Sequence, residues 1–265
     1  MCGIVGYVGT RASVEVLMGG LKRLEYRGYD SAGVAVIDAH GHLDTRKHAG
    51  KLGILSDDLA ATPLADGQTG IGHTRWATHG GPTDENAHPH LGDEGKLALI
   101  HNGIIENFSE LKDELLASGH SFSSQTDSEV AALLVGDAFR QTGDLTTAML
   151  QVVNRLEGAF TLLAVHADQP DVVVGARRNS PLVIGLGEGE NFLGSDVAAF
   201  VEYTRHAMEI GQDQLVTIRP DSVEVVDFAG QPVTPTTFEV DWDASAAEKG
   251  GWSSFMAKEI SEEPE

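Results

Sequence analysis

The chain has 265 residues, of which 41% are hydrophobic and 22% are charged, as in globular proteins of one large domain or two small ones. Its formal net charge of −22, from 18 basic and 40 acidic side chains, argues against binding to a nucleic-acid backbone. No apolar run reaches the ~18 residues that a membrane helix needs, and from the first residues we expect no secretory signal. The one cysteine excludes an internal disulfide, so we expect a cytoplasmic protein with no nucleic-acid and no membrane partner.

The first part of the chain alternates short β-type runs with amphipathic helices. Apolar runs and turn residues predict strands at residues 4–8, 33–38, 70–74 and 96–101. Apolar residues spaced by three or four predict helices at residues 13–25, 108–118 and 145–156. A capping box from Thr126 to Glu129 predicts a further helix that carries the apolar run 130–135. Ser13 is expected to cap the first helix, and Gly119 to end the second, because glycine tolerates a left-handed backbone.

From residue 159 onward the chain is mainly of β type. The pattern predicts strands at residues 160–167, 171–176, 182–186, 214–219 and 222–227. Groups of neighbouring strands between helices indicate layered sheets and helices, not a regular βαβ winding. Residues 240–265 are rich in acidic side chains and are interpreted as a solvated connector.

The only cysteine is the second residue of the chain, and small and apolar residues follow it. An aminopeptidase readily removes an initiator methionine before a small residue, which would leave Cys2 with a free α-amine. The thiol and the amine, with ordinary pKa values of about 8.5 and about 7.7 to 8.0, then form a nucleophile with its own base. Judged by position alone, Cys2 is more readily interpreted as a buried residue of the first strand.

Three further segments combine polar or charged groups with glycines. They are residues 26–33 (YRGYDSAG), between a helix and a strand, residues 73–80 (HTRWATHG), at a strand end, and residues 101–107 (HNGIIEN), at the end of another strand. Loops at strand ends bring functional groups together on a rigid scaffold, so these segments are expected to form a site. Each segment taken alone is also compatible with ordinary turn chemistry.

The order Cys-Gly-Ile-Val-Gly, RGYDSAG, HTRWATHG and HNGIIEN resembles that of the class II glutamine amidotransferases, which are N-terminal-nucleophile hydrolases. The HTRWATHG wording, with Asn-Ala-His-Pro-His at residues 86–90, is most similar to the glutaminase domains of the glucosamine-6-phosphate synthase family. The resemblance implies an α+β fold, a four-layer αββα sandwich with two mainly antiparallel sheets. It also implies a glutaminase domain over residues 1–239 and a connector over residues 240–265.

The resemblance assigns the catalytic roles to three residues. It implies that the Cys2 thiolate attacks the side-chain amide of L-glutamine, and that the freed α-amine moves the proton through a water. The side-chain amide of Asn102 and the backbone N–H of Gly103 correspond to the oxyanion hole of the family. Ammonia leaves, a γ-glutamyl thioester remains, and water releases glutamate. No cofactor is implied.

The resemblance also assigns the groups that bind free glutamine. Arg75 corresponds to the clamp on the α-carboxylate, and Asp127 to the partner of the α-ammonium. The substrate pocket is completed by Trp76, Thr78, His79 and Gly103. Arg27 is a supporting residue that holds a loop of the site. Without the resemblance, Asp127 is more readily explained as a helix cap.

Four histidines lie close together in the chain, between residues 73 and 90. His88 and His90 could hold a metal, but no neighbouring ligand completes a typical zinc spacing, and we expect no metal. His101 is expected to pack or to form hydrogen bonds at its strand end, not to act as a base.

In the family that this chain resembles, the glutaminase domain is followed by a larger sugar-phosphate isomerase portion. That portion uses ammonia to make glucosamine 6-phosphate from fructose 6-phosphate. Residues 255–260 resemble the connector to that portion. We therefore expect this chain to release ammonia without making glucosamine 6-phosphate, and to be monomeric. The alternatives are the glutaminase domain of another class II amidotransferase, an amidase for acylated amino acids or lactams, and an inactive ligand-binding or regulatory module of the same fold.

Overall fold

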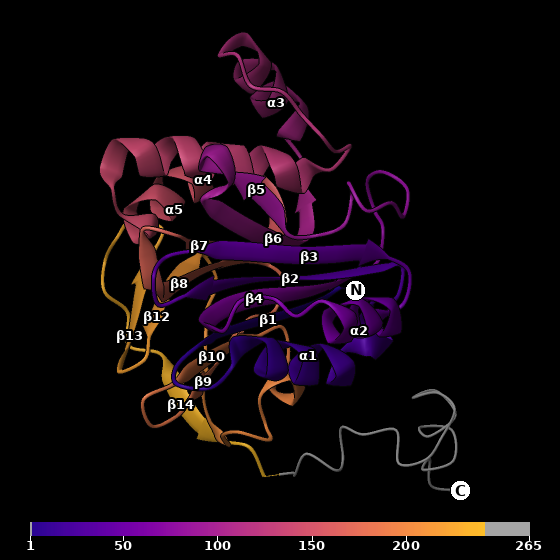
Figure 1. The fold of residues 1–265 in the computed structure, drawn as a ribbon. Coiled ribbons are helices and arrows are strands. Elements are labelled where there is room, and N and C mark those ends of the chain that lie inside the picture. The colour runs from indigo at the N-terminus through magenta and orange to yellow at the C-terminus, as the bar shows by residue number, and fades with distance from the viewer. Residues whose placement is uncertain (1, 242–265) are drawn as a thin grey trace, which may run out of the picture.

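The computed structural model describes residues 2–241, which form two β-sheets packed face to face (Figure 1). The first sheet has eight strands, in the order β14 (Thr236–Glu239), β11 (His206–Glu209), β9 (Val183–Leu186), β10 (Asn191–Gly194), β1 (Gly3–Val8), β4 (Gly67–Arg75), β2 (Ser31–Asp38) and β3 (Leu43–Ala49). The second has six, in the order β13 (Ser222–Asp227), β12 (Gln214–Arg219), β8 (Gln169–Arg178), β7 (Gly158–His166), β6 (Leu97–Ile105) and β5 (His90–Gly92). Neighbouring strands in both sheets run antiparallel.

Helices cover the outer face of each sheet, which produces four layers (Figure 1). On the eight-stranded sheet lie α1 (Ser13–Arg23) and α2 (Leu52–Ala61), and on the six-stranded sheet lie α4 (Asp127–Thr142) and α5 (Leu145–Val153). The remaining helix, α3 (Phe108–Ala117), contacts α4 and projects from the body. Within the described residues the 3-10 turns are η1 (Glu25–Arg27), η2 (Asp93–Gly95) and η3 (Val197–Ala199). The predicted αββα sandwich is confirmed.

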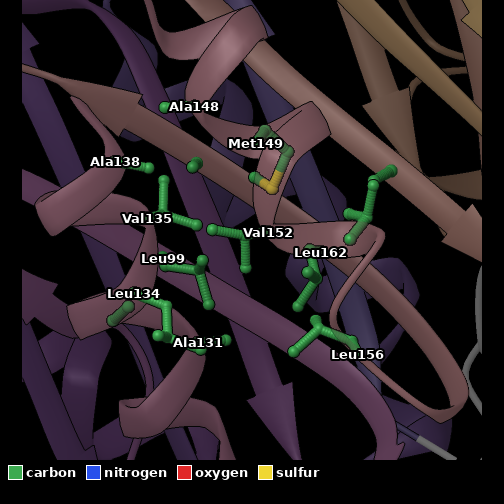
Figure 2. Packing of buried hydrophobic residues seen from close by; sticks show 14 of the residues in the cluster. Leu99, Ala131, Leu134, Val135, Ala138, Ala148, Met149, Val152, Leu156 and Leu162 are labelled. Atoms are coloured by element: carbon green, nitrogen blue, oxygen red, sulfur yellow. The ribbon is translucent and has the colours of Figure 1, made fainter. Parts of the chain in front are cut away.

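Three apolar clusters hold the layers together. The middle cluster fills the space between the two sheets and includes Ile4, Ile71 and Ile100, all fully buried. Figure 2 shows the cluster beneath α4 and α5, where their apolar side chains meet Leu99 and Leu162 of the sheet. A strand that is buried on both faces does not alternate between apolar and polar residues. This explains the nearly continuous apolar runs of β1 and β7. No helix in the described part of the chain is long and apolar enough to cross a membrane.

Two of the three helix-end predictions are confirmed and one is wrong. Thr126 is the N-cap of α4 and accepts a hydrogen bond from the backbone N–H of Glu129, and Gly119 follows α3 with a positive φ of 96°. The N-cap of α1, in contrast, is Ala12. Ser13 is the first helical residue, and its hydroxyl donates to the Gly67 carbonyl at 2.8 Å, so it ties the helix to β4 instead of capping it.

The strand β6 is longer than predicted. The strand predicted at residues 96–101 ends too early, because pairing with β7 continues through Asn102 and Gly103 to Ile105, and its end lies within residues 101–107. The helix α2 and the strands β3, β5, β10, β11 and β14 were not predicted. Several of these strands have only three or four residues, and β3 is half-buried along its whole length, so a period-two pattern is weak there.

The turn between β5 and β6 is strained and is held by a carboxylate. Asp93 and Glu94 have positive φ values of 46° and 54°. The Asp93 carboxylate accepts hydrogen bonds from Arg140 Nη1 of α4 at 2.9 Å and from His166 Nε2 of β7 at 3.0 Å. Burial alone would raise the pKa of Asp93, but the bonds from Arg140 and His166 outweigh it and lower this pKa. The ionised carboxylate therefore fastens the turn to α4.

We expect Asp93→Asn to lower the free energy of unfolding by about 1 to 2 kcal/mol near pH 7, because asparagine tolerates a positive φ but loses the charge-assisted bonds. The pKa of Asp93 is lower in the folded than in the unfolded chain. The extra free energy of unfolding that Asp93 gives the wild type is therefore present above the unfolded pKa of about 3.9, and it is lost as the pH falls through the folded pKa. Urea unfolding near pH 7 and pH 3 measures this difference. The control is Asp168→Asn, whose 57% exposed side chain should change stability by less than about 0.5 kcal/mol. Equal losses in both variants would contradict the assignment.

Candidate active site

Cys2 lies directly before β1, beside the end of the adjacent strand β4. The register pairs Gly3 with Thr74, so the cysteine reaches the point where β4 passes into Trp76. The Trp76 backbone N–H donates to Cys2 Sγ at 3.1 Å, and Sγ lies 3.6 Å from the Trp76 carbonyl oxygen. A Cβ added at Gly3 would lie 2.6 Å from Thr74 Oγ1 and 2.9 Å from Leu24 Cβ. Glycine next to Cys2 therefore allows the close packing that places the thiol.

A cavity of about 310 Å³ opens at Cys2, between the two sheets' ends and the start of α4. Most of the predicted site residues line it, namely Cys2, Arg27, Arg75, Trp76, Thr78, Asn102, Gly103 and Asp127. His79 is the exception, because its ring packs edge-on against Phe108 with centroids 5.2 Å apart. Tertiary structure thus gathers segments that are distant in the chain into one pocket.

The surroundings of Cys2 favour the neutral thiol. Burial raises the pKa of the Cys2 thiol above its ordinary value, and the nearby Asp30 carboxylate acts in the same direction. The hydrogen bond from Trp76 and the charge of Arg75 oppose this shift without cancelling it. Because only the thiolate is an effective nucleophile, a thiol in this environment needs a base within reach.

Asn102 places a side-chain amide beside the cysteine from the other sheet. Its Nδ2 donates to the Cys2 carbonyl oxygen at 3.0 Å, and its side chain is nearly buried. Gly103 follows with a φ of 126°, and an added Cβ would lie 2.0 Å from the Ala159 carbonyl oxygen. No side chain fits there, so the backbone at this point of β6 requires glycine. The site thus combines a thiol with an amide donor in one cavity.

Arg75, the last residue of β4, links the pocket to the loop that follows it. Its buried guanidinium donates to the carbonyl oxygens of His79, Gly80 (3.3 Å) and Gly81 (3.2 Å). These contacts fold the loop back toward the strand end. A guanidinium has five N–H donors, so donors remain for an anionic ligand in the cavity.

Asp127 is the first residue of α4 and faces the same cavity. Its Oδ2 accepts a hydrogen bond from the Ile105 backbone N–H at 2.9 Å and lies 3.9 Å from His101 Nδ1. The alternative of Asp127 as the helix cap is wrong, because Thr126 has that role. A buried carboxylate that lines the same cavity as Arg75 makes the pocket complementary to a ligand that carries both charges.

Arg27 and Trp76 form part of the pocket's outer wall. Arg27 Nη2 pairs with Asp196 Oδ2 at 2.9 Å, which holds the end of η1 to the start of η3. Trp76 is 49% exposed, and its ring meets Tyr29 edge-on with centroids 5.3 Å apart. Arg27 lies in η1 before β2, and Trp76 directly follows β4, so both residues belong to segments at strand ends.

The structure adds lining residues that were not assigned from the sequence. They are His88, His101, Ile104, Thr126, Ser128, Ser180 and Pro181. Ser180 and Pro181 follow β8 after Asn179, which has a φ of 62°, so a turn at a strand end was the available signal. His88 and His90 meet with ring centroids 4.8 Å apart, but within residues 2–241 no group of three or more potential ligands is placed to hold a metal.

A four-layer αββα sandwich with a cysteine at the start of a central strand defines the class of N-terminal-nucleophile hydrolases. The glutamine amidotransferase domain family matches residues 56–228 of the chain. The chain belongs to this family, as the resemblance of its motifs predicted.

The chain is similar over its whole length to part of longer proteins. Over its full length the chain is 72% identical to the glutamine–fructose-6-phosphate aminotransferase (isomerizing) of Leifsonia xyli subsp. xyli. It is 62% identical to the protein of the same name from Streptomyces coelicolor, and it spans 43% of the length of each of these relatives. The fold is also similar to a solved structure of glutamine phosphoribosylpyrophosphate amidotransferase from B. subtilis, with a TM-score of 0.72 and 26% identity. The match covers 86% of this chain and 49% of the B. subtilis chain.

Proposed function

We propose that this chain hydrolyses L-glutamine to glutamate and ammonia, with Cys2 as the nucleophile. The observation that carries the proposal is the approach of the Asn102 amide to Cys2 in a cavity that also contains Arg75 and Asp127. An amide substrate needs a nucleophile and a donor for the developing oxyanion, and glutamine adds a carboxylate and an ammonium that need partners. Membership in the glutamine amidotransferase domain family supports the same reaction.

The mechanism begins when removal of Met1, which lies outside the described residues, frees the α-amine of Cys2. The amine takes the thiol proton through a water, and the thiolate adds to the amide carbon of glutamine. Asn102 Nδ2 and the Gly103 N–H stabilise the oxyanion. The ammonium returns its proton to the departing nitrogen, so ammonia leaves and a γ-glutamyl thioester remains. Water, deprotonated by the amine, then attacks the thioester, and the thiolate departs as glutamate is released.

The charged wall of the pocket orients the substrate. In our proposal Arg75 binds the α-carboxylate and Asp127 the α-ammonium, while Trp76, Thr78 and Gly103 enclose the chain of glutamine. Arg27 supports the wall through Asp196. His79 acts through its carbonyl oxygen, which accepts from Arg75, and its ring stays outside the cavity.

We further propose that a longer cytoplasmic chain uses this ammonia to aminate fructose 6-phosphate in a sugar-phosphate isomerase portion, yielding glucosamine 6-phosphate. Two relatives named glutamine–fructose-6-phosphate aminotransferase match this chain from end to end, over 43% of their own length. This match supports fructose 6-phosphate as the acceptor over the acceptor of another amidotransferase. The proposed domain over residues 1–239 ends with β14. Apart from Val240 and Asp241, the proposed connector 240–265 lies outside the described residues. The 265-residue chain alone is expected to be monomeric.

The test combines intact mass with a glutaminase assay on the 265-residue chain. The expected result is loss of the Met1 mass and release of equal amounts of glutamate and ammonia. Hydroxylamine should divert the thioester to γ-glutamyl hydroxamate, since it is a stronger nucleophile than water. A processed, folded chain that produces neither glutamate nor hydroxamate would overturn the proposal in favour of an inactive binding module.

The contribution of Asp127 can be tested with a glutamine analogue that lacks the α-amine, 4-carbamoylbutanoate. We expect Asp127→Asn to raise KM for glutamine about 10- to 100-fold, because a charge-assisted bond is lost while an oxygen remains for the Ile105 N–H. The wild type should prefer glutamine over the analogue, and the variant should lose most of that preference. Asp137→Asn, on the same helix but outside the pocket, is the control. An amidase for other acyl amides would show no preference for the α-amine.

A further inference from the structure

The Asn102 side chain sits between two groups that it contacts with opposite ends. Its Nδ2 lies 3.0 Å from the Cys2 carbonyl oxygen, and its Oδ1 lies 2.9 Å from His73 Nε2. His73 Nε2 also lies 3.0 Å from the His101 carbonyl oxygen. His73 is on β4 and Asn102 on β6, so this contact joins the two sheets beside the candidate active site.

The two carbonyl oxygens determine which atoms donate. A backbone carbonyl can only accept, so His73 Nε2 must carry its hydrogen to bond the His101 carbonyl. The Asn102 atom that faces the same N–H must then be the amide oxygen. The Cys2 carbonyl independently requires the NH₂ group on the other side. Both ends of the amide are therefore determined, and one of the two Nδ2 hydrogens remains for a ligand in the cavity.

The surroundings keep His73 in this state. Its side chain is fully buried, and the ring of His88 lies against it with centroids 4.1 Å apart. Burial lowers the pKa of His73 to about 3, and the bonds to Asn102 and His101 only partly oppose that shift, while the charges of His101 and Arg75 lower it further. The imidazole is therefore neutral across the pH range in which enzymes of this kind are assayed. A neutral imidazole carries a hydrogen on only one of its two nitrogens, here Nε2.

We propose that His73 is a positioning residue, which holds the Asn102 amide with its NH₂ toward Cys2 and so keeps the oxyanion donor ready. This inference rests on the proposed glutamine hydrolysis. A rotated amide would present its oxygen to the Cys2 carbonyl and to the developing oxyanion, and both contacts would be repulsive. His73 thus contributes to the reaction through Asn102 without touching the substrate.

Two replacements separate the donor from the volume of the ring. His73→Met fills the space without a donor, and we expect kcat to fall at least about tenfold, up to the 10²–10³-fold associated with loss of one oxyanion donor, with KM for glutamine nearly unchanged. His73→Gln retains an N–H donor at about the distance of Nε2 and should recover most of kcat. His73→Asn, whose amide falls short of Asn102, should behave as His73→Met and replaces it if that variant does not fold.

A double-mutant cycle with Asn102→Ala identifies the route of the effect. If His73 acts through Asn102, then His73→Met combined with Asn102→Ala should be no slower than Asn102→Ala alone, within about threefold. Multiplied losses would overturn the inference, as would equal kcat values for His73→Gln and His73→Met. Alkylation of Cys2 by iodoacetamide needs no oxyanion hole and should proceed at the wild-type rate in folded His73 variants.

The matched control is His166→Met, because His166 is also a fully buried histidine with a bonded Nε2, but it lies outside the pocket against Asp93. Its kcat should equal that of the wild type, and its stability should fall. An inactive wild type refutes the proposed hydrolysis itself. An active wild type with a fully active His73→Met variant refutes only the positioning role.

Discussion

Replacement of Cys2 by alanine is expected to abolish glutamine hydrolysis, with a loss of at least about 10⁴-fold in kcat, because no other group in the proposed mechanism forms the covalent intermediate. The fold should persist, since Cys2 lies before β1 and alanine is smaller. Glutamate release, hydroxamate formation and thermal unfolding of the two proteins measure these effects. Unchanged glutaminase activity in Cys2→Ala would contradict the mechanism.

The position of Cys2 should matter as much as its identity. An alanine inserted between Met1 and Cys2 leaves the thiol in the chain but converts its α-amine into a non-basic amide. Because burial raises the pKa of the thiol, this variant lacks both a thiolate and a base near neutral pH, and its activity should fall as far as that of Cys2→Ala. A substantially active insertion variant would show that another group acts as the base.

Asn102→Ala is expected to lower kcat about 10²- to 10³-fold and to leave KM for glutamine nearly unchanged, because the Nδ2 donor acts mainly on the charge that develops in the transition state. Steady-state kinetics measure both constants. Asn107→Ala is the control, since Asn107 lies just beyond β6 and bonds Arg155 and Glu157 outside the pocket. A large rise in KM with unchanged kcat would instead assign Asn102 to ground-state binding.

Secondary structure was predictable where burial is one-sided or complete. The strands 214–219 and 222–227 match β12 and β13, and the capping box correctly starts α4, because local hydrogen bonding decides those ends. The capping prediction for Ser13 is wrong because the Gly67 carbonyl, distant in sequence, takes its hydroxyl. Residues 101–103 belong to a strand because β7 pairs with them, and no local signal reports a partner strand.

The sequence predicted which residues belong to the candidate site better than it predicted how they contact one another. The motif resemblance named eight residues that line one cavity, and it named His79, whose ring lies elsewhere. It did not reveal Ser180 and Pro181, which reach the cavity from the turn after β8. It also treated His73 only as one of several clustered histidines, since the sequence alone does not show that β4 and β6 come into contact across the two sheets.

The sequence by itself determined the layered α+β architecture, the family and the chemical groups of the site, because apolar periodicity and four ordered motifs are properties of the linear chain. Only the tertiary structure decided how those groups face one another. Cys2 approaches Asn102 because β1 and β6 belong to two sheets packed face to face, and the Asn102 amide has one orientation because His73 and Cys2 contact its opposite ends. Orientation depends on atoms that are remote in sequence, so no local pattern encodes it.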